Sequence, residues 1–429
     1  MIFDSESVFE ENVITVLKQH GWKDGVLRYP TERDLLDNWK DILYRNNNDI
    51  DRLGKYPLTD GEMTQIIEQI ETLRTPLALN SFVNGRTVSI TRDNKEDVAH
   101  FGKEVSLYIY DRKEIAGGKS TYQIAQQPVY PAKNKMLNSR RGDLVLLING
   151  MPLIHIELKK SGIPVSQATN QIEKYAHEGV FTGLFRLVQI FVAMNPDDAV
   201  YFANPGVDKF NPSYYFHWAD YNNEPICGGQ NPGKDEWKLF IGGTSGTAGL
   251  LSIPMAHQLI GFYTIADSAD GCLKVLRSYQ YIAANAISDV VRKCDWEQRP
   301  ATPGRPGGYV WHTTGSGKTM TSFKSAQLIA DSHDADKVVF LMDRIELGTQ
   351  SLKEYRSFAD SETEVQGTEN TGVLRDKLNS TNVNDTLIVT SIQKMSNVKA
   401  GERGVTQTWL DQLAARRIVF IVDECHRST

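Results

Sequence analysis

The sequence predicts an α/β protein built from two domains. At 429 residues the chain exceeds the size of one ordinary domain. Strand-like apolar runs alternate with stretches of helical periodicity, and the runs at 308–311 and 417–422 each lead directly into a polar loop. Continuous apolar runs are typical of strands buried in a parallel sheet, and ligands of such sheets bind beyond the carboxyl ends of the strands. We therefore expect a ligand site where these two runs end.

The composition excludes several classes of protein. Hydrophobic residues make up 40% and charged residues 23% of the chain, as in globular proteins, and no apolar run is long enough to span a bilayer. The N-terminus lacks the positive segment of a signal peptide. The net charge of −6 gives no global sign of nucleic-acid binding, so contact with DNA would require a local basic patch or partner proteins. Four scattered cysteines without metal or redox spacing fit a cytoplasmic location with no membrane contact.

The first 110 residues read mainly as helices. Ser5 is a suitable N-cap for a helix that Gly21 ends. Residues 30–80 contain further helical patterns, and Pro76 is expected to end the last of them. Two short strands are expected to follow, at 88–90 and 105–110.

A hairpin around Asn149-Gly150 is the most informative stretch of the N-terminal half. Two apolar runs flank this dipeptide, which is the strongest short signal for a two-residue turn. With the turn at this position or one residue later, Asp143 lies across the ladder within one residue of Glu157. Glu157 and Lys159 are two residues apart on one strand and therefore share a face.

This hairpin brings two carboxylates and an ammonium group together at the edge of a sheet. Paired carboxylates can hold a divalent cation that stabilises charge on a phosphodiester and lowers the pKa of its bound water. Lys159 can stabilise the transition state or help to activate water. Asp143 and Glu157 are therefore candidate catalytic residues and metal ligands. The alternative is an ordinary solvated strand edge, which is what a bare Glu-x-Lys pattern usually is.

The C-terminal half carries the pattern of a phosphate-binding loop. The apolar run 308–311 leads into His-Thr-Thr-Gly-Ser-Gly-Lys-Thr at 312–319, and a helical pattern follows. Glycines let backbone N–H groups point at an anion, and the helix adds its positive N-terminus. Lys318 would reach the β- and γ-phosphates and Thr319 would ligate Mg²⁺. The expected nucleotide-binding residues are Thr314, Gly315, Ser316, Gly317, Lys318 and Thr319. The alternative is a Gly-Ser turn before a helix, since His312 stands where the strict pattern has Gly.

An acidic pair follows the second apolar run. Residues 417–422 end in Asp423-Glu424-Cys425-His426. At the carboxyl edge of a parallel sheet, Asp423 can hold Mg²⁺ and Glu424 can polarise an attacking water. An acidic turn that merely caps a strand is the alternative.

The loop and the acidic pair resemble motifs I and II of superfamily 2 helicases and translocases. Gln280 lies on a helix expected from 274 to 287, in the position of the family glutamine that reads the adenine edge; a solvated helix glutamine is the alternative. The strands expected at 338–342 and 387–394 end in residues that resemble the DNA-contacting motifs, among them Asp343 and Arg344.

The hairpin resembles the core of PD-(D/E)xK nucleases. Gln171 and Tyr175, on a helix expected at 166–175, match the Gln-x-x-x-Tyr motif of RecB-like members and lie on one helix face. Glu10 is placed like the acidic residue of the first nuclease helix, which implies a metal-ligand role, with Glu6 and Glu11 as alternatives. One departure is that Gly142 stands where the family has Pro before the aspartate.

Together these features resemble the restriction (motor) subunit of type I restriction-modification enzymes. The resemblance implies a RecB-like endonuclease domain at 1–250 and a first RecA-like ATPase lobe at 251–429. It also implies ATP and Mg²⁺ as cofactors, double-stranded DNA as substrate, and modification (methyltransferase) and specificity subunits as partners. ATP-driven translocation would be coupled to cleavage away from the recognition site. The family's second lobe, which carries an arginine finger, is not found up to Thr429, so we expect ATP binding without translocation by this chain alone.

Two other functions remain open at this point. A nuclease–helicase of DNA repair or of another phage-defence system would share these motifs. A DNA-binding scaffold with decayed sites is the non-enzymatic alternative. The intact set of candidate residues argues against decay, because drift would rarely spare all of them: Asp143, Glu157, Lys159, Lys318, Asp423 and Glu424.

Overall fold

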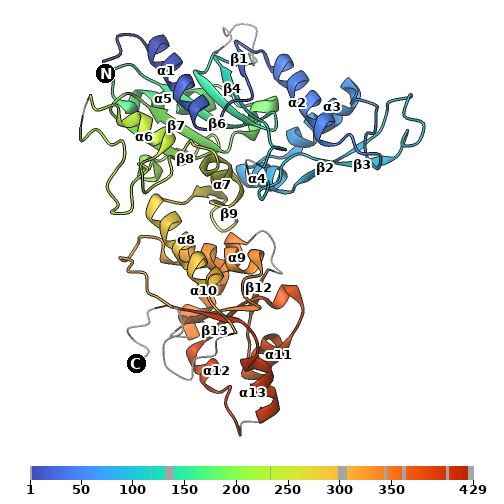
Figure 1. The fold of residues 1–429 in the computed structure, drawn as a ribbon, viewed down its shortest axis with the longest axis vertical. Coiled ribbons are helices and arrows are strands. Elements are labelled where there is room, and N and C mark those ends of the chain that lie inside the picture. Colours follow the sequence, from blue (N-terminus) through green and yellow to red (C-terminus); the bar gives the residue numbers. More distant parts are fainter. Residues whose placement is uncertain are drawn as a thin grey trace. The chain divides into compact units, whose positions relative to one another are not determined.

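The computed structural model describes residues 2–115, 117–130, 140–231, 233–297, 307–342, 345–359, 364–401 and 405–423. The chain forms two compact units, which comprise Met1–Ala266 with Gly271–Tyr279 and Asp267–Asp270 with Gln280–Thr429 (Figure 1). The boundary expected at residue 250 lies inside the first unit, because β10 (Cys272–Val275) packs on α4 (Pro76–Asn84) and β8 (Ala199–Ala203).

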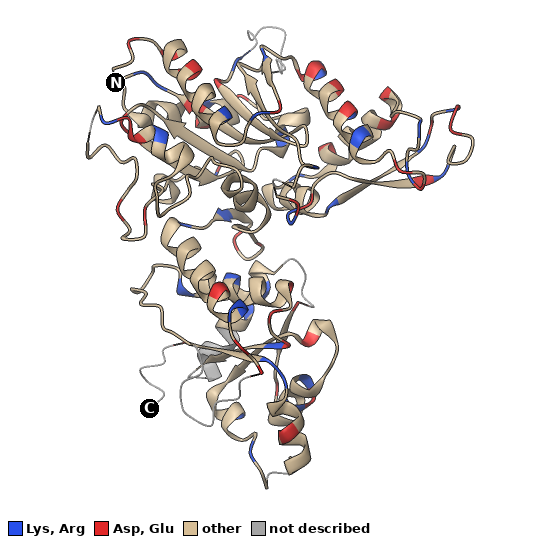
Figure 2. Ribbon diagram, viewed as in Figure 1, with Lys and Arg blue, Asp and Glu red and all other residues tan. Residues whose placement is uncertain are grey.

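Charges of both signs are spread over the two units. Lys and Arg residues are interspersed with Asp and Glu residues in each (Figure 2). No helix within the described ranges combines the length and the apolar character needed to cross a membrane.

A six-stranded mixed sheet forms the core of the first unit. Its strand order is β1-β4-β5-β6-β7-β8. The pairs β1–β4 and β6–β7 are parallel, and the other neighbours are antiparallel. Every residue of the strands from β4 to β8 is buried, so both faces of this part of the sheet are covered. The strands are β1 (Val26–Arg28), β4 (Tyr122–Gln126), β5 (Leu144–Ile148), β6 (Met151–Leu158), β7 (Ile190–Met194) and β8 (Ala199–Ala203).

The helices that pack on this sheet carry the candidate residues outside the hairpin. Helix α1 (Glu6–Gln19) packs on β6 and on α6 (Glu236–Gly242), and α5 (Val165–His177) packs on β6 and β7. The N-cap predicted for α1 is confirmed, because the side chain of Ser5 accepts a hydrogen bond from the Val8 N–H. Smaller elements complete this part of the unit: η1 (Gly183–Leu187), η2 (Pro212–Tyr214), α7 (Met255–Gly261) and β9 (Thr264–Asp267), which pairs with β10.

Three helices and a two-stranded ribbon lie between β1 and β4 in the sequence. They are α2 (Glu32–Asn46), α3 (Asp60–Thr72), α4, β2 (Thr87–Thr91) and β3 (Glu104–Tyr108). Thr31 and Thr59 form capping boxes with Asp34 and Glu62 at the starts of α2 and α3. The expectation that Pro76 ends a helix is wrong. Pro76 begins α4 behind the Thr75 cap, since proline is tolerated where the first-turn N–H has no partner.

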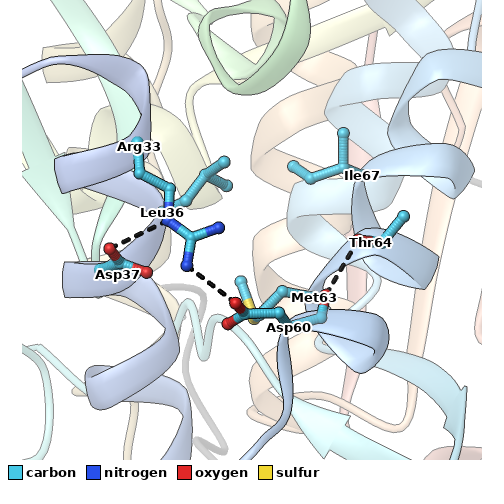
Figure 3. Close-up of a pocket in the computed structure, with 7 residues that line it drawn as sticks. All are labelled: Arg33, Leu36, Asp37, Asp60, Met63, Thr64 and Ile67. Carbon is cyan, nitrogen blue, oxygen red and sulfur yellow. Dashed lines mark hydrogen bonds and ion pairs between the residues drawn. The ribbon is translucent and has the colours of Figure 1, made fainter.

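A small pocket of about 150 Å³ lies between α2 and α3. Arg33 on α2 pairs with Asp37 on the same helix and with Asp60 on α3 (Figure 3). The charged side chains that line this pocket therefore form ion pairs with one another.

A buried ion network ties α3 to the residues that follow β2. The side chain of Arg92 is fully buried and donates to both carboxylate oxygens of Glu62, at 2.8 and 2.6 Å, and to Asp97 Oδ2 at 3.0 Å. A further N–H of Arg92 donates to the Tyr56 carbonyl at 2.9 Å. Charges this deeply buried are stable only when they are paired and hydrogen-bonded, as they are here.

The second unit is built on a parallel sheet of four described strands in the order β12-β13-β11-β14. Val339, Ile388, Leu374 and Leu378 meet in its core. The strands are β11 (Lys337–Met342), β12 (Val365–Gly367), β13 (Leu387–Ser391) and β14 (Ile418–Val422). The helices are α8 (Ser278–Arg292), α9 (Lys318–Ser332), α10 (Ile345–Phe358), α11 (Thr371–Asn379), α12 (Ile392–Ser396) and α13 (Gln407–Ala414), with a short η3 (Val383–Asp385).

Four sequence-based expectations about this part of the chain are wrong. Residues 308–311 join no strand, and Tyr309 and Trp311 are 85% and 88% exposed. Strand β14 is not buried on both faces, because it lies at the edge of the described sheet with Phe420 46% exposed. Residues 272–275 pair as β10, so the following helix begins at Ser278 and not at 274. Strand β13 ends at Ser391, whose side chain caps α12.

Candidate functional site

The β5–β6 hairpin has the predicted turn and register. Ile148 pairs with Met151 across Asn149-Gly150, whose φ angles of 53° and 84° are those of a two-residue turn. A register shift near Leu146 adds one residue to β6, and Leu144 then pairs with Ile156. The next position along brings Asp143 beside Glu157.

The turn of this hairpin is enclosed by neighbouring chain. The Asn149 side chain accepts from the Thr121 N–H at 2.9 Å and donates to the Ile109 carbonyl at 3.2 Å. A Cβ atom on Gly150 would lie 2.9 Å from the Cα of Trp39 on α2. The turn therefore has no room for a larger residue.

The two carboxyl groups form a buried acidic pair. Asp143 Oδ2 accepts from the Leu158 N–H at 2.6 Å, and Glu157 is fully buried. Burial and the nearby charge of Glu157 raise the pKa of Asp143 well above its usual range. Burial likewise raises the pKa of Glu157 to about 8. Neither carboxylate oxygen of Glu157 makes a hydrogen bond within the described parts of the chain.

Lys159 lies beside this pair, as expected from its position two residues after Glu157. Its Nζ is 3.7 Å from Glu157 Oε1 and 3.6 Å from Glu6 Oε1. The ammonium charge lowers the pKa of Glu157 and so partly opposes the effect of burial. The structure thus brings Asp143, Glu157 and Lys159 together at one end of the hairpin.

Helix α5 connects to the same end of the hairpin through Gln171 and Tyr175. Gln171 Nε2 donates to Tyr175 Oη at 2.6 Å, and the Tyr175 hydroxyl donates to the Arg141 carbonyl at 2.9 Å. Both residues line an open pocket of about 340 Å³ together with Arg140, Gln167, Asn170 and Lys174. The two motif residues therefore hold the backbone just before Asp143.

Glu10 is buried on α1 but is engaged elsewhere. Its carboxylate accepts from Gln126 Nε2 at 2.6 Å and from Gln127 Nε2 at 3.2 Å. Its charge contributes to the raised pKa of Asp143. In the described residues, no group of three or more His, Cys, Asp or Glu side chains is arranged to hold a metal ion. Glu10 is thus close enough to act on Asp143 electrostatically, while its own hydrogen bonds go to the two glutamines. Of the alternatives for Glu10, Glu6 lies near Lys159 and Glu11 pairs with Arg28.

Sequence reasoning missed two buried residues behind the carboxylates. His155 shares the face of β6 that carries Glu157, with its Nε2 3.3 Å from Glu157 Oε2. The Tyr130 hydroxyl lies 2.8 Å from His155 Nδ1. A second polar residue beside Glu157 in a largely apolar strand was the signal available for His155, whereas nothing in the sequence pairs it with Tyr130.

The phosphate-loop pattern forms a turn at the start of α9. Gly315 and Gly317 have φ angles of 78° and 82°, and α9 begins at Lys318 without a side-chain cap. The Ser316 hydroxyl donates to the Thr313 carbonyl at 2.7 Å. Thr314 lies exposed in the same turn, and Thr319 is in the first turn of α9. An uncapped helix start after two glycines can bind an anion through its N–H groups.

Gln280 on α8 contacts this loop directly. Its Nε2 donates to the Gly317 carbonyl at 3.2 Å, and a Cβ atom on Gly317 would lie 2.5 Å from the same nitrogen. The structure thus brings Gln280 to the loop that the sequence assigns to phosphate binding.

Asp423 follows β14 at the carboxyl edge of the sheet. Its N–H donates to the Leu341 carbonyl at 3.0 Å. The charge of Asp423 helps to raise the pKa of the buried Tyr355 hydroxyl. That hydroxyl donates to Ser322 Oγ at 2.8 Å, and Ser322 in turn donates to the Thr319 carbonyl at 3.0 Å. Asp423 therefore lies near the first turn of α9. Glu424, Asp343 and Arg344 lie outside the described residues.

Two family models match the chain over the two units. Residues 4–210 match the model of the type I restriction enzyme R protein N terminus, and residues 279–429 match that of the SWI2/SNF2 ATPase. The match and the fold together define a protein that joins the N-terminal region of a restriction enzyme to an ATPase region.

Curated relatives agree with both models. The type I restriction enzyme SsaAORF53P endonuclease subunit of Staphylococcus saprophyticus is 33% identical over the whole of this chain and 40% of its own length. A counterpart from Staphylococcus aureus, SauMSSORF170P, has the same identity and coverage. The type I restriction enzyme EcoprrI endonuclease subunit of Escherichia coli is 29% identical over 49% of this chain and 62% of its own length. The chain belongs to the family of type I restriction enzyme endonuclease subunits, and it spans about 40% of the length of the staphylococcal relatives.

Proposed function

We propose that the first unit is a PD-(D/E)xK (RecB-like) endonuclease domain and that the second is a RecA-like lobe of a superfamily 2 motor. In the complete protein, ATP hydrolysis would drive translocation of double-stranded DNA, and the first unit would cut that DNA away from the recognition site. The observation that carries the nuclease assignment is the buried Asp143–Glu157 pair with Lys159 beside it on one hairpin. An ordinary strand edge would leave these charges solvated instead of raising the pKa of both carboxyl groups.

The residues of the hairpin fit a Mg²⁺ ion. Mg²⁺ is bound by one or two carboxylates together with water and substrate phosphates. Asp143 and Glu157 offer such a pair, and both oxygens of Glu157 lack hydrogen-bond donors in the described part of the chain. When bound, the ion would stabilise charge on the phosphodiester and make its water more acidic. Asp143 and Glu157 would hold it, and Lys159 would stabilise the charge that develops on the phosphoryl oxygens. Gln171 and Tyr175 would keep the Asp143 strand end in position.

The second unit would bind ATP with Mg²⁺ at the start of α9. The backbone N–H groups of the loop would contact the phosphates, and Lys318 would reach the β- and γ-phosphates. Thr319 and Asp423 would hold Mg²⁺, and Glu424 would orient the attacking water. Because Gln280 donates to the Gly317 carbonyl, its amide would order the loop as well as read the adenine edge. This assignment is supported by the match to the SWI2/SNF2 ATPase model.

The partners that we propose are a modification (methyltransferase) subunit and a specificity subunit. The names of the relatives describe endonuclease subunits of type I restriction enzymes, and a subunit acts within a larger enzyme. Recognition of the DNA sequence would fall to these partners.

The experiment compares Lys159→Ala and Lys318→Ala in the full-length protein assembled with both partner subunits. Unmethylated plasmid cleavage and ATP hydrolysis are scored separately, in the presence of Mg²⁺ and ATP. We expect Lys159→Ala to abolish cleavage and keep ATP hydrolysis, and Lys318→Ala to abolish both. Continued cleavage by Lys159→Ala would mean that the hairpin is only a strand edge. Continued ATP hydrolysis by Lys318→Ala would remove the nucleotide assignment.

A further inference from the structure

Behind the carboxylate pair lies a buried imidazole that faces Glu157. His155 is fully buried on β6, and its Nε2 is 3.3 Å from Glu157 Oε2, while Lys159 approaches the other oxygen, Oε1. His155 Nε2 and Glu157 Oε2 face each other without forming a hydrogen bond, and His155 Nε2 has no other hydrogen-bond partner in the described ranges. The two oxygens of Glu157 are thus approached from different sides by two different nitrogens.

Tyr130 contacts the other ring nitrogen of His155. Tyr130 is 1% exposed and His155 is fully buried. The Tyr130 hydroxyl lies at hydrogen-bond distance from His155 Nδ1, 2.8 Å away. A neutral imidazole that accepts at Nδ1 carries its proton on Nε2, the atom that faces Glu157.

The surrounding chain holds this arrangement in place. The Tyr130 N–H donates to the Arg140 carbonyl at 2.9 Å, which anchors it beside the Asp143 strand. The imidazole is packed edge-on against the rings of Phe181 and Phe191, at centroid distances of 5.4 and 5.9 Å. The ring therefore cannot turn its Nε2 away from Glu157 without displacing core side chains.

Gly142 leaves the space that the two rings occupy. A Cβ atom at this position would lie 2.5 Å from Tyr130 Oη and 2.8 Å from His155 Cε1. Such distances are shorter than atoms of a side chain tolerate, so a larger residue would push the pair apart. Gly142 stands in place of the family proline, next to Asp143. Its lack of a side chain leaves the space that the Tyr130–His155 pair occupies.

We propose that Tyr130 and His155 form a hydrogen-bonded pair that orients the Glu157 carboxylate for metal binding, with His155 as a positioning residue. This rests on the proposed nuclease function of the hairpin. His155 directs Oε2 of Glu157, and Tyr130 fixes the tautomer of His155. Hydrogen-bond partners behind a ligating carboxylate orient it toward the ion, and their loss weakens metal binding.

The experiment measures metal binding directly in the full-length protein without nucleotide. Binding of Mn²⁺ is followed by electron paramagnetic resonance, and an Asp143→Asn variant supplies the background from other sites. We expect His155→Phe to raise the Kd for Mn²⁺ by about 10- to 100-fold. His155→Gln, which retains an N–H donor, is expected to recover most of the affinity. Tyr130→Phe, a smaller change that covers the case in which His155→Phe does not fold, is expected to weaken binding about 3- to 10-fold.

His257 offers a matched control in the same unit. It is a fully buried imidazole whose Nδ1 lies 2.9 Å from the Tyr122 hydroxyl, but its Nε2 faces the Asp111 carbonyl at 3.0 Å and no carboxylate. His257→Phe therefore removes the same kind of tyrosine–histidine pair. We expect it to lower the unfolding temperature and to leave Mn²⁺ binding at wild-type affinity.

Two results would overturn the positioning role. One is wild-type Mn²⁺ affinity in both His155→Phe and Tyr130→Phe, and the other is equal loss of affinity in His155→Phe and His257→Phe. The plasmid assay separates this from failure of the nuclease assignment. If Lys159→Ala abolishes cleavage while His155→Phe binds Mn²⁺ normally, the positioning role is wrong and the nuclease assignment stands. If Lys159→Ala still cuts, the nuclease assignment falls as well.

Discussion

Glu157 shows how a candidate ligand can weaken the fold that carries it. Burial raises its pKa to about 8, against 4.5 for an exposed glutamate. Between these two pH values the unfolded chain loses a proton that the folded chain keeps, so the free energy of unfolding falls as pH rises, by at most about 1.4 kcal/mol per pH unit. The loss of folding stability caused by burying Glu157 is smallest below pH 4.5, where the side chain is protonated in both states. A bound Mg²⁺ would offset it by favouring the ionised carboxylate.

We therefore expect Glu157→Gln to stabilise the metal-free first unit. In EDTA at about pH 7.5 the variant should unfold at a higher temperature than the wild type, and the difference should shrink at about pH 5. Addition of Mg²⁺ should stabilise the wild type more than the variant. Glu173→Gln, on the surface of α5, is the control and should leave the unfolding temperature unchanged at both pH values. A variant that unfolds below the wild type at the higher pH would contradict the prediction.

At this same scale the sequence predicts some residues of the site and not others. Asp143 and Glu157 were predictable to within one residue because a two-residue turn limits their pairing across the hairpin, and the register shift near Leu146 then brings Asp143 beside Glu157. His155 and Tyr130 were not, because their contact depends on how two separate segments pack, which local periodicity does not encode. For Glu10, the sequence predicts the position of the residue but not the partners of its side chain. Its helix face was predictable, but the two glutamines that take its carboxylate come from a distant strand and loop.

At the scale of elements, the buried network around Arg92 joins α3 to the β2–β3 ribbon. Glu62→Ala removes the main partner of a fully buried guanidinium, and we expect it to lower the free energy of unfolding of the first unit by about 3–5 kcal/mol. Lys40→Ala breaks the exposed ion pair with Asp60 and should cost about 0–1 kcal/mol. Urea unfolding of both variants at neutral pH measures the difference. Equal effects would mean that the network contributes no more than a surface pair.

Two of the elements that the sequence mispredicted share one physical cause. A continuous apolar run indicates a tendency to be buried, but it does not specify which strand will lie beside it. Residues 308–311 and β14 both have such runs, yet the first joins no strand and the second lies at the edge of the described sheet. Pro76 failed for a different reason, since proline is compatible with a helix start as well as a helix end.

At the scale of the whole molecule, each unit encloses its own core. Ile388 is fully buried in the core of the second unit, where it packs with Val339, Leu374 and Leu378. We expect Ile388→Ala to lower the free energy of unfolding of that unit by about 2–5 kcal/mol. Calorimetry should show two transitions, of which Ile388→Ala shifts one and Glu62→Ala the other. A single transition that both variants shift equally would show that the units unfold together.

The enclosed turn at Asn149-Gly150 has a consequence for how such a chain can vary through evolution. A loop that is free on the surface can gain or lose residues, whereas this turn lies against Trp39 and is bonded on both sides. A one-residue insertion that shifted the register would turn Asp143 and Glu157 toward opposite faces of the sheet. We therefore expect the length of the turn to stay constant. The turn contains no candidate catalytic group, and the whole of β5 separates it from Asp143.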